Sequence, residues 1–271
     1  MAPNLLAIAG SDPSGGAGIQ ADLKTFAALR CYGMAVITAL TAQNTHGVFA
    51  VHAPPPNFIA EQIDAIFADI DVAAVKIGML ASAAIVEVVA DRLAVHKPQF
   101  IVLDPVLVAT SGDALAASDV GPAMIRHLFP LATLVTPNLA EAAALSGHAT
   151  IGRAIVEDES VRAAARQLQS LGAKAVLIKG GHAEGASSDD VLFDGPARQL
   201  FSAPRVATKN THGTGCTLSS AIAAYLGHGL PLAYAVGAAK SYLTGALKAA
   251  DELNVGHGHG PAHHFYDLWR N

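Results

Sequence analysis

The sequence predicts an α/β protein with a doubly wound, mainly parallel sheet, helices on both of its faces and an antiparallel hairpin at one edge. Short, continuous apolar runs alternate with stretches in which apolar residues recur every three or four positions. This alternation is typical of parallel strands joined by helices that cover both faces of the sheet. The apolar runs read as strands buried on both faces lie at 5–10, 34–40, 73–80, 99–106, 131–136 and 173–179.

The segments between these strands carry helix signals. A helix is expected to begin at Asp158 or Glu159 and to end at Gly172. Residues 191–194 and 198–201 flank Gly195 and Pro196 and predict the edge hairpin. With no internal repeat or linker, residues 1–271 are expected to form a single domain. Two further helices are marked by apolar stripes, one at Ile19, Leu23 and Phe26 and one at Ile59, Ile63, Ile66 and Ile70.

Composition narrows the class of protein. The chain has 271 residues, a net charge of −5 and no basic stripe, which argues against nucleic acid as the main partner. Its two cysteines lie far apart, as expected in a reducing cytoplasm, and neither a signal peptide nor a membrane span is predicted. Residues 31–60 and 210–239 contain no charged side chain. Burial or an interface would explain them, and the first of these stretches makes a homodimer the expectation.

Polar residues, or in one case a glycine and a methionine, stand at the carboxyl end of every predicted parallel strand. Ligands of open parallel sheets bind beyond these ends, so such residues at all six ends indicate an enzyme. These residues fall at 11–18, 43–44, 78–79, 104, 136–138 and 179–182.

Residues 209–224 are the most informative stretch. A polar run turns on Gly213 and Gly215 and enters a segment of small, helix-compatible residues. The first backbone N–H groups of such a helix are free to bind phosphate or a developing oxyanion. We call residues 213–216 the anion loop. Cys216 lies in it, where the field of the helix is expected to lower the pKa of the thiol and make it a base or nucleophile. A tight turn beside a small buried cysteine remains the alternative.

Two acids at neighbouring strand ends, Asp104 and Glu141, suit a Mg²⁺ ion that also takes water and phosphate oxygens. Each acid also has a structural alternative. Glu141 completes a capping box with Asn138, and Asp104 precedes a proline, where aspartate is common in turns. Three lysines are candidates for binding an anion. Lys179 would reach over the crevice, and Lys240 would need an anionic partner if it is buried. Lys209 precedes the anion loop, and exposure to solvent is the alternative for it.

The amide of Gln43 can make two parallel hydrogen bonds to the edge of a heteroaromatic base, with Met79 and Val106 as apolar walls. Core packing is the alternative for the two apolar residues. The glycines from Gly10 to Gly18 do not match a dinucleotide fingerprint and are better suited to close backbone approach. The histidines of 256–264 match no zinc motif, and a connector before a last short helix is expected there.

The chain carries six longer motifs, at 9–26, 41–45 (Thr-Ala-Gln-Asn-Thr), 76–80 (Lys-Ile-Gly-Met-Leu), 136–141, 179–182 (Lys-Gly-Gly-His) and 209–220. Together these motifs resemble those of the hydroxymethylpyrimidine/phosphomethylpyrimidine kinases of thiamine biosynthesis. The resemblance covers essentially the whole chain.

The resemblance implies a ribokinase-like fold, ATP with Mg²⁺, and two successive phosphorylations of 4-amino-5-hydroxymethyl-2-methylpyrimidine. It implies that Cys216 is the base, in place of the aspartate usual in the wider superfamily. The other implied roles are the anion hole with its catalytic lysine (Gly213, Thr214, Gly215, Lys179), the pyrimidine site (Gln43, Gly10, Asp12, Met79, Val106), the nucleotide site (Asn138, Lys179, Lys209, Thr211, Lys240) and the metal site (Asp104, Glu141). Two other hypotheses stay open: a pyridoxal or dual kinase, and a non-catalytic pyrimidine or B6 binding protein.

Overall fold

The computed structural model describes residues 1–107, 117–148, 159–181 and 185–269, and its strands all belong to one sheet. The strands are β1 (Asn4–Ser11), β2 (Tyr32–Asn44), β3 (Gly47–His52), β4 (Ala74–Ile77), β5 (Ile101–Leu103), β6 (Leu134–Val135), β7 (Ala175–Lys179), β8 (Ser187–Asp194) and β9 (Ala197–Pro204). Their order is β3-β2-β1-β4-β5-β6-β7-β8-β9. In this order, the six neighbouring strands β2, β1, β4, β5, β6 and β7 are parallel to one another. Strands β3, β8 and β9 are antiparallel to their neighbours.

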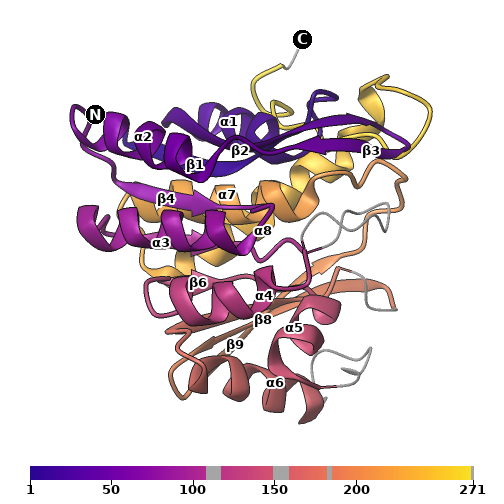
Figure 1. Cartoon of the computed structure of the whole chain (residues 1–271). Helices are drawn as coiled ribbons and strands as arrows, with labels where there is room; N and C mark the ends of the chain where they lie inside the picture. Colours follow the sequence, from indigo (N-terminus) through magenta and orange to yellow (C-terminus); the bar gives the residue numbers. More distant parts are fainter. Residues whose placement is uncertain (108–116, 149–158, 182–184, 270–271) are drawn as a thin grey trace.

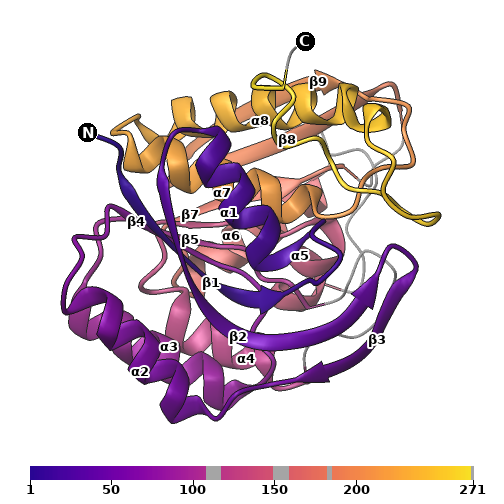
Figure 2. The same ribbon diagram turned by 90° about the horizontal axis from the view of Figure 1, so that it is seen from above.

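Helices cover both faces of this sheet (Figures 1 and 2). One face is packed by α1 (Gly18–Ala28), α7 (Thr214–Gly227) and α8 (Leu232–Lys248). The other is packed by α2 (Pro56–Phe67), α3 (Ala83–His96), α4 (Val120–Ala123), α5 (Leu139–Ser146) and α6 (Glu159–Ser170). A π-helical segment, Met124–Leu128, continues α4, and a 3₁₀ turn, Ala250–Glu252, follows α8. The predicted fold class is therefore confirmed.

The strand sequences explain this three-layer arrangement. In β1, Leu6 and Ile8 face one core while Leu5 and Ala7 face the other. A strand buried on both faces needs apolar side chains at every position, which is why these strands read as continuous apolar runs. The helix expected to begin near residue 159 is α6. Gly172 follows its end and has a φ of +112°, a conformation that favours glycine. Asp158, the alternative start, lies outside the described residues.

The edge hairpin β8–β9 lies where it is predicted, but the sequence analysis missed β3 at the opposite edge. The β2–β3 hairpin extends past the helices and is prominent in Figure 2. Phe49 and Val51 on β3 are 69% and 43% exposed. Burial within the chain therefore does not explain the charge-free composition of this part of 31–60.

A buried ion pair interrupts the apolar run of β4. Lys76 Nζ lies 2.7 Å from Asp22 Oδ1 of α1, and both side chains are fully buried. Ser220 Oγ of α7 donates to the same carboxylate oxygen at 2.6 Å. The pair fixes α1 and α7 to the middle of the sheet, close beneath the anion loop.

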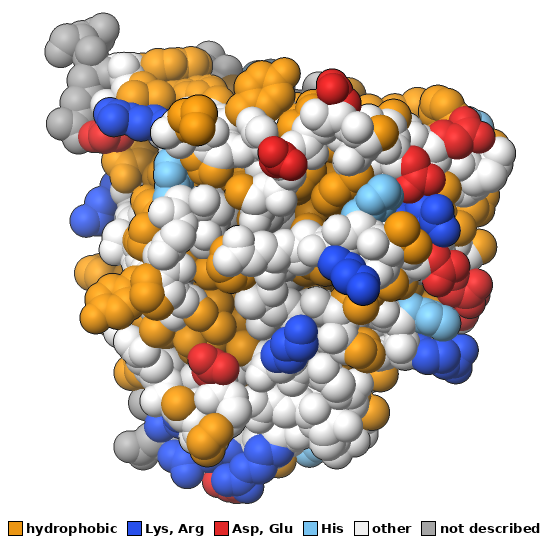
Figure 3. All heavy atoms as spheres, turned by 90° about the vertical axis from the view of Figure 1, so that its left-hand side faces the viewer, with side chains coloured by type: hydrophobic (Ala, Val, Ile, Leu, Met, Phe, Trp, Pro, Cys, Tyr) orange, Lys and Arg blue, Asp and Glu red, His pale blue; other side chains and the backbone are white. Residues whose placement is uncertain are grey.

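On the face shown in Figure 3, acidic and basic side chains are scattered among apolar and uncharged groups. Among the described residues, every helix is too short or too polar to cross a membrane.

Candidate active site

A cavity of about 300 Å³ lies at the carboxyl ends of the parallel strands. It brings together residues that are up to 237 positions apart in sequence, from Gly10 to Leu247. Lys209 is exposed and does not line it, so the structure does not support its expected place at the nucleotide. The other predicted site residues all line the cavity: Gly10, Asp12, Gln43, Met79, Asp104, Val106, Asn138, Glu141, Lys179, Thr211, Gly213, Thr214, Gly215, Cys216 and Lys240.

The anion loop has the predicted form. Helix α7 begins at Thr214, and Gly213 caps it with φ +75°, a conformation that favours glycine. A Cβ at Gly213 would overlap the backbone oxygen of Gly16, so the loop also packs backbone to backbone against the segment after β1. The N–H groups of Gly215 and Cys216 belong to the first helical turn and have no acceptor within the helix. They are free to bind an anion in the cavity.

The expectation for the pKa of Cys216 is wrong for the ligand-free protein. Burial raises the pKa of its thiol to about 11, and the nearby carboxylates of Asp22 and Asp104 act in the same direction. The charge of Lys76 opposes this rise without cancelling it. The thiol is therefore protonated at neutral pH.

Lys179 and Asp104 form the charged centre of the cavity. Lys179 Nζ lies 2.6 Å from Asp104 Oδ1, which also accepts from Thr136 Oγ1 at 2.9 Å. Burial opposes ionisation of Asp104, but the charges of Lys179 and Lys76, with the hydrogen bonds from Lys179 and Thr136, together outweigh it and lower the carboxyl pKa. A Cβ on Gly215 would lie 3.2 Å from Lys179 Nζ, so this ammonium lies against the start of α7. Two sources of positive potential thus act on the same part of the cavity.

Glu141 performs the capping role that its spacing predicts. Its Oε2 accepts from the Asn138 N–H at 2.8 Å, and Asn138 Oδ1 accepts from the Glu141 N–H at 2.9 Å. Burial raises the pKa of Glu141 to about 7, with Lys179 opposing the rise and Asp104 adding to it.

Protein side chains would supply only part of the coordination shell of a magnesium ion in this cavity. Asp104 and Glu141 both line the cavity and influence each other's ionisation. Among the described residues, no three His, Cys, Asp or Glu side chains are grouped as a metal site. Mg²⁺ commonly takes one or two carboxylates and completes its shell with water and phosphate oxygens, so two acids beside an anion loop fit that ion.

Lys240 has the anionic partner that its burial requires. Its Nζ lies 2.7 Å from Asp190 Oδ2 of β8 and donates to Ser188 Oγ at 3.1 Å. Asp190 Oδ1 also accepts from the Gly180 N–H at 2.9 Å, which links this pair to the turn after Lys179. The sequence indicated that a partner was needed but gave no sign that it was Asp190.

Apolar groups form the wall near Gly10. A Cβ at Gly10 would lie 2.9 Å from the sulfur of Met79, so glycine allows that side chain to lie close to β1. Met79 and Val106 both line the cavity. They give this part of the cavity an apolar lining.

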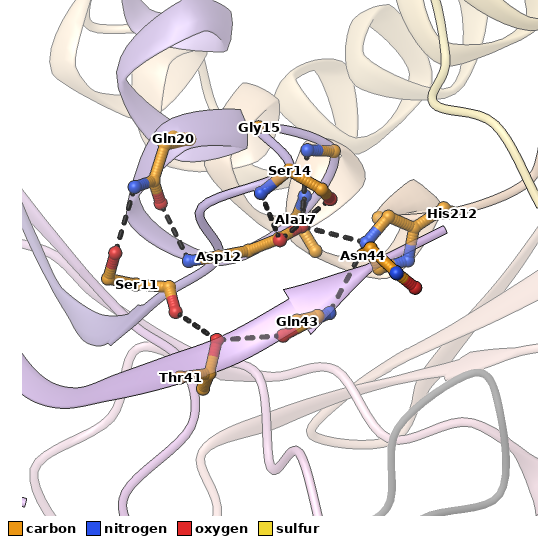
Figure 4. A network of polar contacts seen from close by, with 12 residues as sticks. Ser11, Asp12, Ser14, Gly15, Ala17, Gln20, Thr41, Gln43, Asn44 and His212 are labelled. Atoms are coloured by element: carbon orange, nitrogen blue, oxygen red, sulfur yellow. Dashed lines mark hydrogen bonds and ion pairs between the residues drawn. The ribbon is translucent and has the colours of Figure 1, made fainter. Parts of the chain in front are cut away.

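Asp12 holds the glycine-rich loop together (Figure 4). Its two carboxylate oxygens accept hydrogen bonds from the backbone of Ser14, Gly16 and Ala17 and from the Ser14 hydroxyl, at 2.7–3.1 Å. Burial disfavours its charge, but these hydrogen bonds and the contact with His212 together lower its pKa. Asp12 therefore shapes the loop after β1, which lines the cavity at Asp12, Ala17 and Gly18.

His212 is a site residue that the sequence analysis missed. Its Nε2 lies 2.8 Å from Asp12 Oδ2 and 3.4 Å from Gln43 Nε2. The only signal in the sequence is its place directly before Gly213, because Asp12 lies 200 positions away.

The glycine- and histidine-rich tail joins the two halves of the site. Residues 256–264, which we call the strap, run from the β2–β3 turn to the anion loop. The N–H groups of Gly258 and His259 donate to Thr45, and that of Gly260 donates to Asn210 Oδ1. Residues 264–268 form turns, so the short final helix expected there is not found.

Comparisons with known proteins agree with this site. The family model for phosphomethylpyrimidine kinase matches residues 12–263. Hydroxymethylpyrimidine/phosphomethylpyrimidine kinase of Rhizobium meliloti is 53% identical over 98% of both chains. The thiamine biosynthesis bifunctional protein of Geobacter sulfurreducens is 51% identical over 96% of this chain and 52% of its own length. Pyridoxal kinase of Staphylococcus aureus, solved with ADP, superimposes with a TM-score of 0.90 at 34% identity over 99% of this chain and 96% of its own.

The nine-stranded sheet and its strand-end cavity define a kinase of the ribokinase-like fold. Within that class, the chain belongs to the phosphomethylpyrimidine kinase family.

Proposed function

We propose that this protein transfers a phosphoryl group from ATP to 4-amino-5-hydroxymethyl-2-methylpyrimidine and then a second to the resulting monophosphate, for thiamine biosynthesis. One observation carries the proposal. A single cavity is lined by the amide of Gln43 together with the apolar side chains of Met79 and Val106, and also by the anion loop and Lys179. The relatives named for the two pyrimidine substrates match over nearly the whole chain and support the same activity.

Phosphoryl transfer needs positioning and charge stabilisation more than covalent chemistry. The N–H groups of Gly213, Thr214, Gly215 and Cys216, with the ammonium of Lys179, would hold the transferring group. Asn138, Thr211 and Lys240 line the part of the cavity proposed for ATP. Asp104 and Glu141 would hold Mg²⁺, which supplies charge neutralisation on phosphate oxygens when bound.

The two steps make different demands on Cys216. In the first step the thiolate would take the proton of the substrate hydroxymethyl group. In the second step the acceptor is a phosphate monoester, which is already largely ionised near neutral pH because its second pKa is about 6. Cys216 is therefore expected to matter for the first step far more than for the second.

A pyridoxal kinase is the second candidate, and the superposition on the Staphylococcus aureus pyridoxal kinase favours it. The test is conversion of the pyrimidine and of pyridoxal by purified protein with ATP and Mg²⁺, with mono- and diphosphate products resolved. Both pyrimidine products support the two-step kinase. Turnover of pyridoxal alone would move the function to vitamin B6 salvage, and absence of all ligand-dependent ATP turnover would favour a binding protein.

We further propose a homodimer that forms through the exposed apolar side chains of the β2–β3 hairpin. Leu40, Phe49 and Val51 are all exposed there in a stretch without charge. Light scattering should give twice the chain mass of 27.7 kDa, and F49D should reduce it to the monomer. A monomeric parent protein would remove the proposal. The continuous sheet supports a single kinase domain over 1–271, and the two free cysteines support a cytoplasmic location.

A further inference from the structure

The side-chain amide of Gln43 lies between two polar side chains, Thr41 and His212 (Figure 4). Its Oε1 is 3.1 Å from Thr41 Oγ1, and its Nε2 is 3.4 Å from His212 Nε2. The two ends of an amide differ chemically, since one only accepts hydrogen bonds and the other only donates them. Their orientation is assigned from the surrounding hydrogen-bond network.

Thr41 determines one end of this network. Its hydroxyl lies 2.8 Å from the carbonyl oxygen of Ser11, which can only accept. A hydroxyl has one hydrogen, and the Ser11 contact uses it. Thr41 Oγ1 therefore presents lone pairs to Gln43, and the group that satisfies them is the NH₂ end of the amide.

His212 determines the other end. If its Nε2 carries a hydrogen, that hydrogen points to Asp12 Oδ2 at 2.8 Å, and the NH₂ end of Gln43 would face another donor. If Nε2 is unprotonated, its lone pair faces the Asp12 carboxylate, and the short contact becomes repulsive. Only an Nε2–H shared between Asp12 and the carbonyl oxygen of Gln43 satisfies all three groups.

We propose that His212, held by Asp12, is a positioning residue that fixes the amide of Gln43 with its oxygen toward His212 and its NH₂ toward Thr41. This exchanges the two ends of the amide relative to the orientation drawn in Figure 4. The ring itself is held on several sides. A Cβ at Gly16 would overlap the imidazole, the backbone N–H of His212 donates to Gly260 at 3.0 Å, and the side chain is only 12% exposed. An imidazole held in this way cannot turn to suit either orientation of the amide.

The orientation of the Gln43 amide determines the orientation in which a substrate can bind. The fixed amide keeps one acceptor site on the His212 side and one N–H on the Thr41 side. An aminopyrimidine that pairs with it must place its amino group toward His212 and its ring nitrogen toward Thr41. In the proposed substrate the hydroxymethyl group is next to the amino group. It is therefore directed toward Gly213, which follows His212 in the chain, and so toward the anion loop.

The amide orientation can be measured without any activity, which separates this proposal from the proposed function. Nitrogen-15 NMR of the ligand-free protein reports which imidazole nitrogen carries hydrogen, with H212Q and Q43E spectra as assignments. We expect His212 Nε2 to be protonated and the Gln43 NH₂ hydrogens to show nuclear Overhauser contacts to Thr41. An unprotonated Nε2, or contacts of that NH₂ to the His212 ring, would overturn the proposal.

Kinetics provide a second test, which rests on the proposed function. H212L removes the donor, whereas H212Q keeps an N–H that can reach the same position. We expect H212L to raise the KM for the pyrimidine about 10-fold or more, with the KM for ATP within about 2-fold, because a buried amide acceptor loses its partner. H212Q should recover most of this loss.

The matched control is H96L, which removes a His–Asp pair of 2.7 Å with Asp64, and neither of these two residues lines the cavity. It should leave both KM values unchanged. Equal effects of H212L on both KM values, or an H212Q enzyme that folds like the parent but is no better than H212L, would contradict a positioning role.

Discussion

The ammonium of Lys179 lies 2.6 Å from the Asp104 carboxylate, although the two residues lie at the ends of strands that are separated by β6. Lys179 ends β7, and Asp104 directly follows β5. Because burial disfavours both charges, each depends on the other to remain ionised. The pair therefore serves the stability of the site as well as its proposed chemistry.

K179M should abolish most activity and also destabilise the fold. Loss of a charge that stabilises the transferring phosphoryl group is expected to lower kcat by at least about 100-fold. The Asp104 carboxylate left unpaired should lower the free energy of unfolding by about 3 kcal/mol or more. D104N/K179M should recover much of the stability but none of the activity. K248A, at an exposed lysine of α8, should change neither quantity, and an active K179M enzyme would contradict the assignment.

The rate of the first phosphorylation should rise with pH above neutrality, because burial raises the pKa of Cys216 to about 11 and the thiolate is scarce at pH 7. C216A should remove this rise and slow the first step much more than the second. Equal losses in both steps would remove the base role. Alkylation by iodoacetamide in a C31S background should likewise be slow at pH 7 and increase steeply toward pH 10.

The Lys76–Asp22 pair should be the most sensitive polar site of the core. K76M leaves a fully buried carboxylate without its cation, which should lower the free energy of unfolding by about 3–5 kcal/mol. D22N/K76M removes both charges and should recover most of that loss. Urea denaturation of the parent and both variants measures the difference. A K76M protein as stable as the parent would show that the pair contributes little.

E141Q should change how stability depends on pH in the metal-free protein. Burial raises the pKa of Glu141 from 4.5 to about 7, so the folded state binds the proton more tightly than the unfolded state. This stabilising contribution is fully present below pH 4.5 and is lost as the pH rises through 7. E141Q keeps the capping box, since glutamine also serves at that position.

Relative to E141Q, the parent should therefore lose up to about 3 kcal/mol between pH 4.5 and 8. Urea denaturation in EDTA across this range measures the difference. Parallel pH profiles for the two proteins would contradict it.

Local relationships were the ones that the sequence predicted best. The capping box of Asn138 and Glu141 spans three residues, and the turn at Gly213 lies next to the helix it begins, so both are visible as short patterns. The apolar runs identified the parallel strands because burial on both faces allows few other residues. The strand β3 was missed because it is an antiparallel edge strand with largely exposed side chains, so it does not follow the alternation of buried strands and helices.

Relationships between distant residues were beyond the sequence alone. Nothing near Lys240 indicates Asp190, and nothing near Asp12 indicates His212. A thiol at a helix N-terminus predicts a lowered pKa, but burial beside two carboxylates reverses that shift for Cys216. In each case the deciding contact is created by packing between elements that lie far apart in the chain.

The strap has a consequence for how the enzyme comes into being during translation. The hairpin of Thr45 leaves the ribosome early, whereas Gly258 and His259 of the strap, which donate to Thr45, emerge more than 200 residues later. A nascent chain can form most of its sheet before these hydrogen bonds exist. The hairpin of Thr45 is therefore tied to the segment before the anion loop only after residue 260 has been synthesised, and a shorter nascent chain carries the hairpin without this tie.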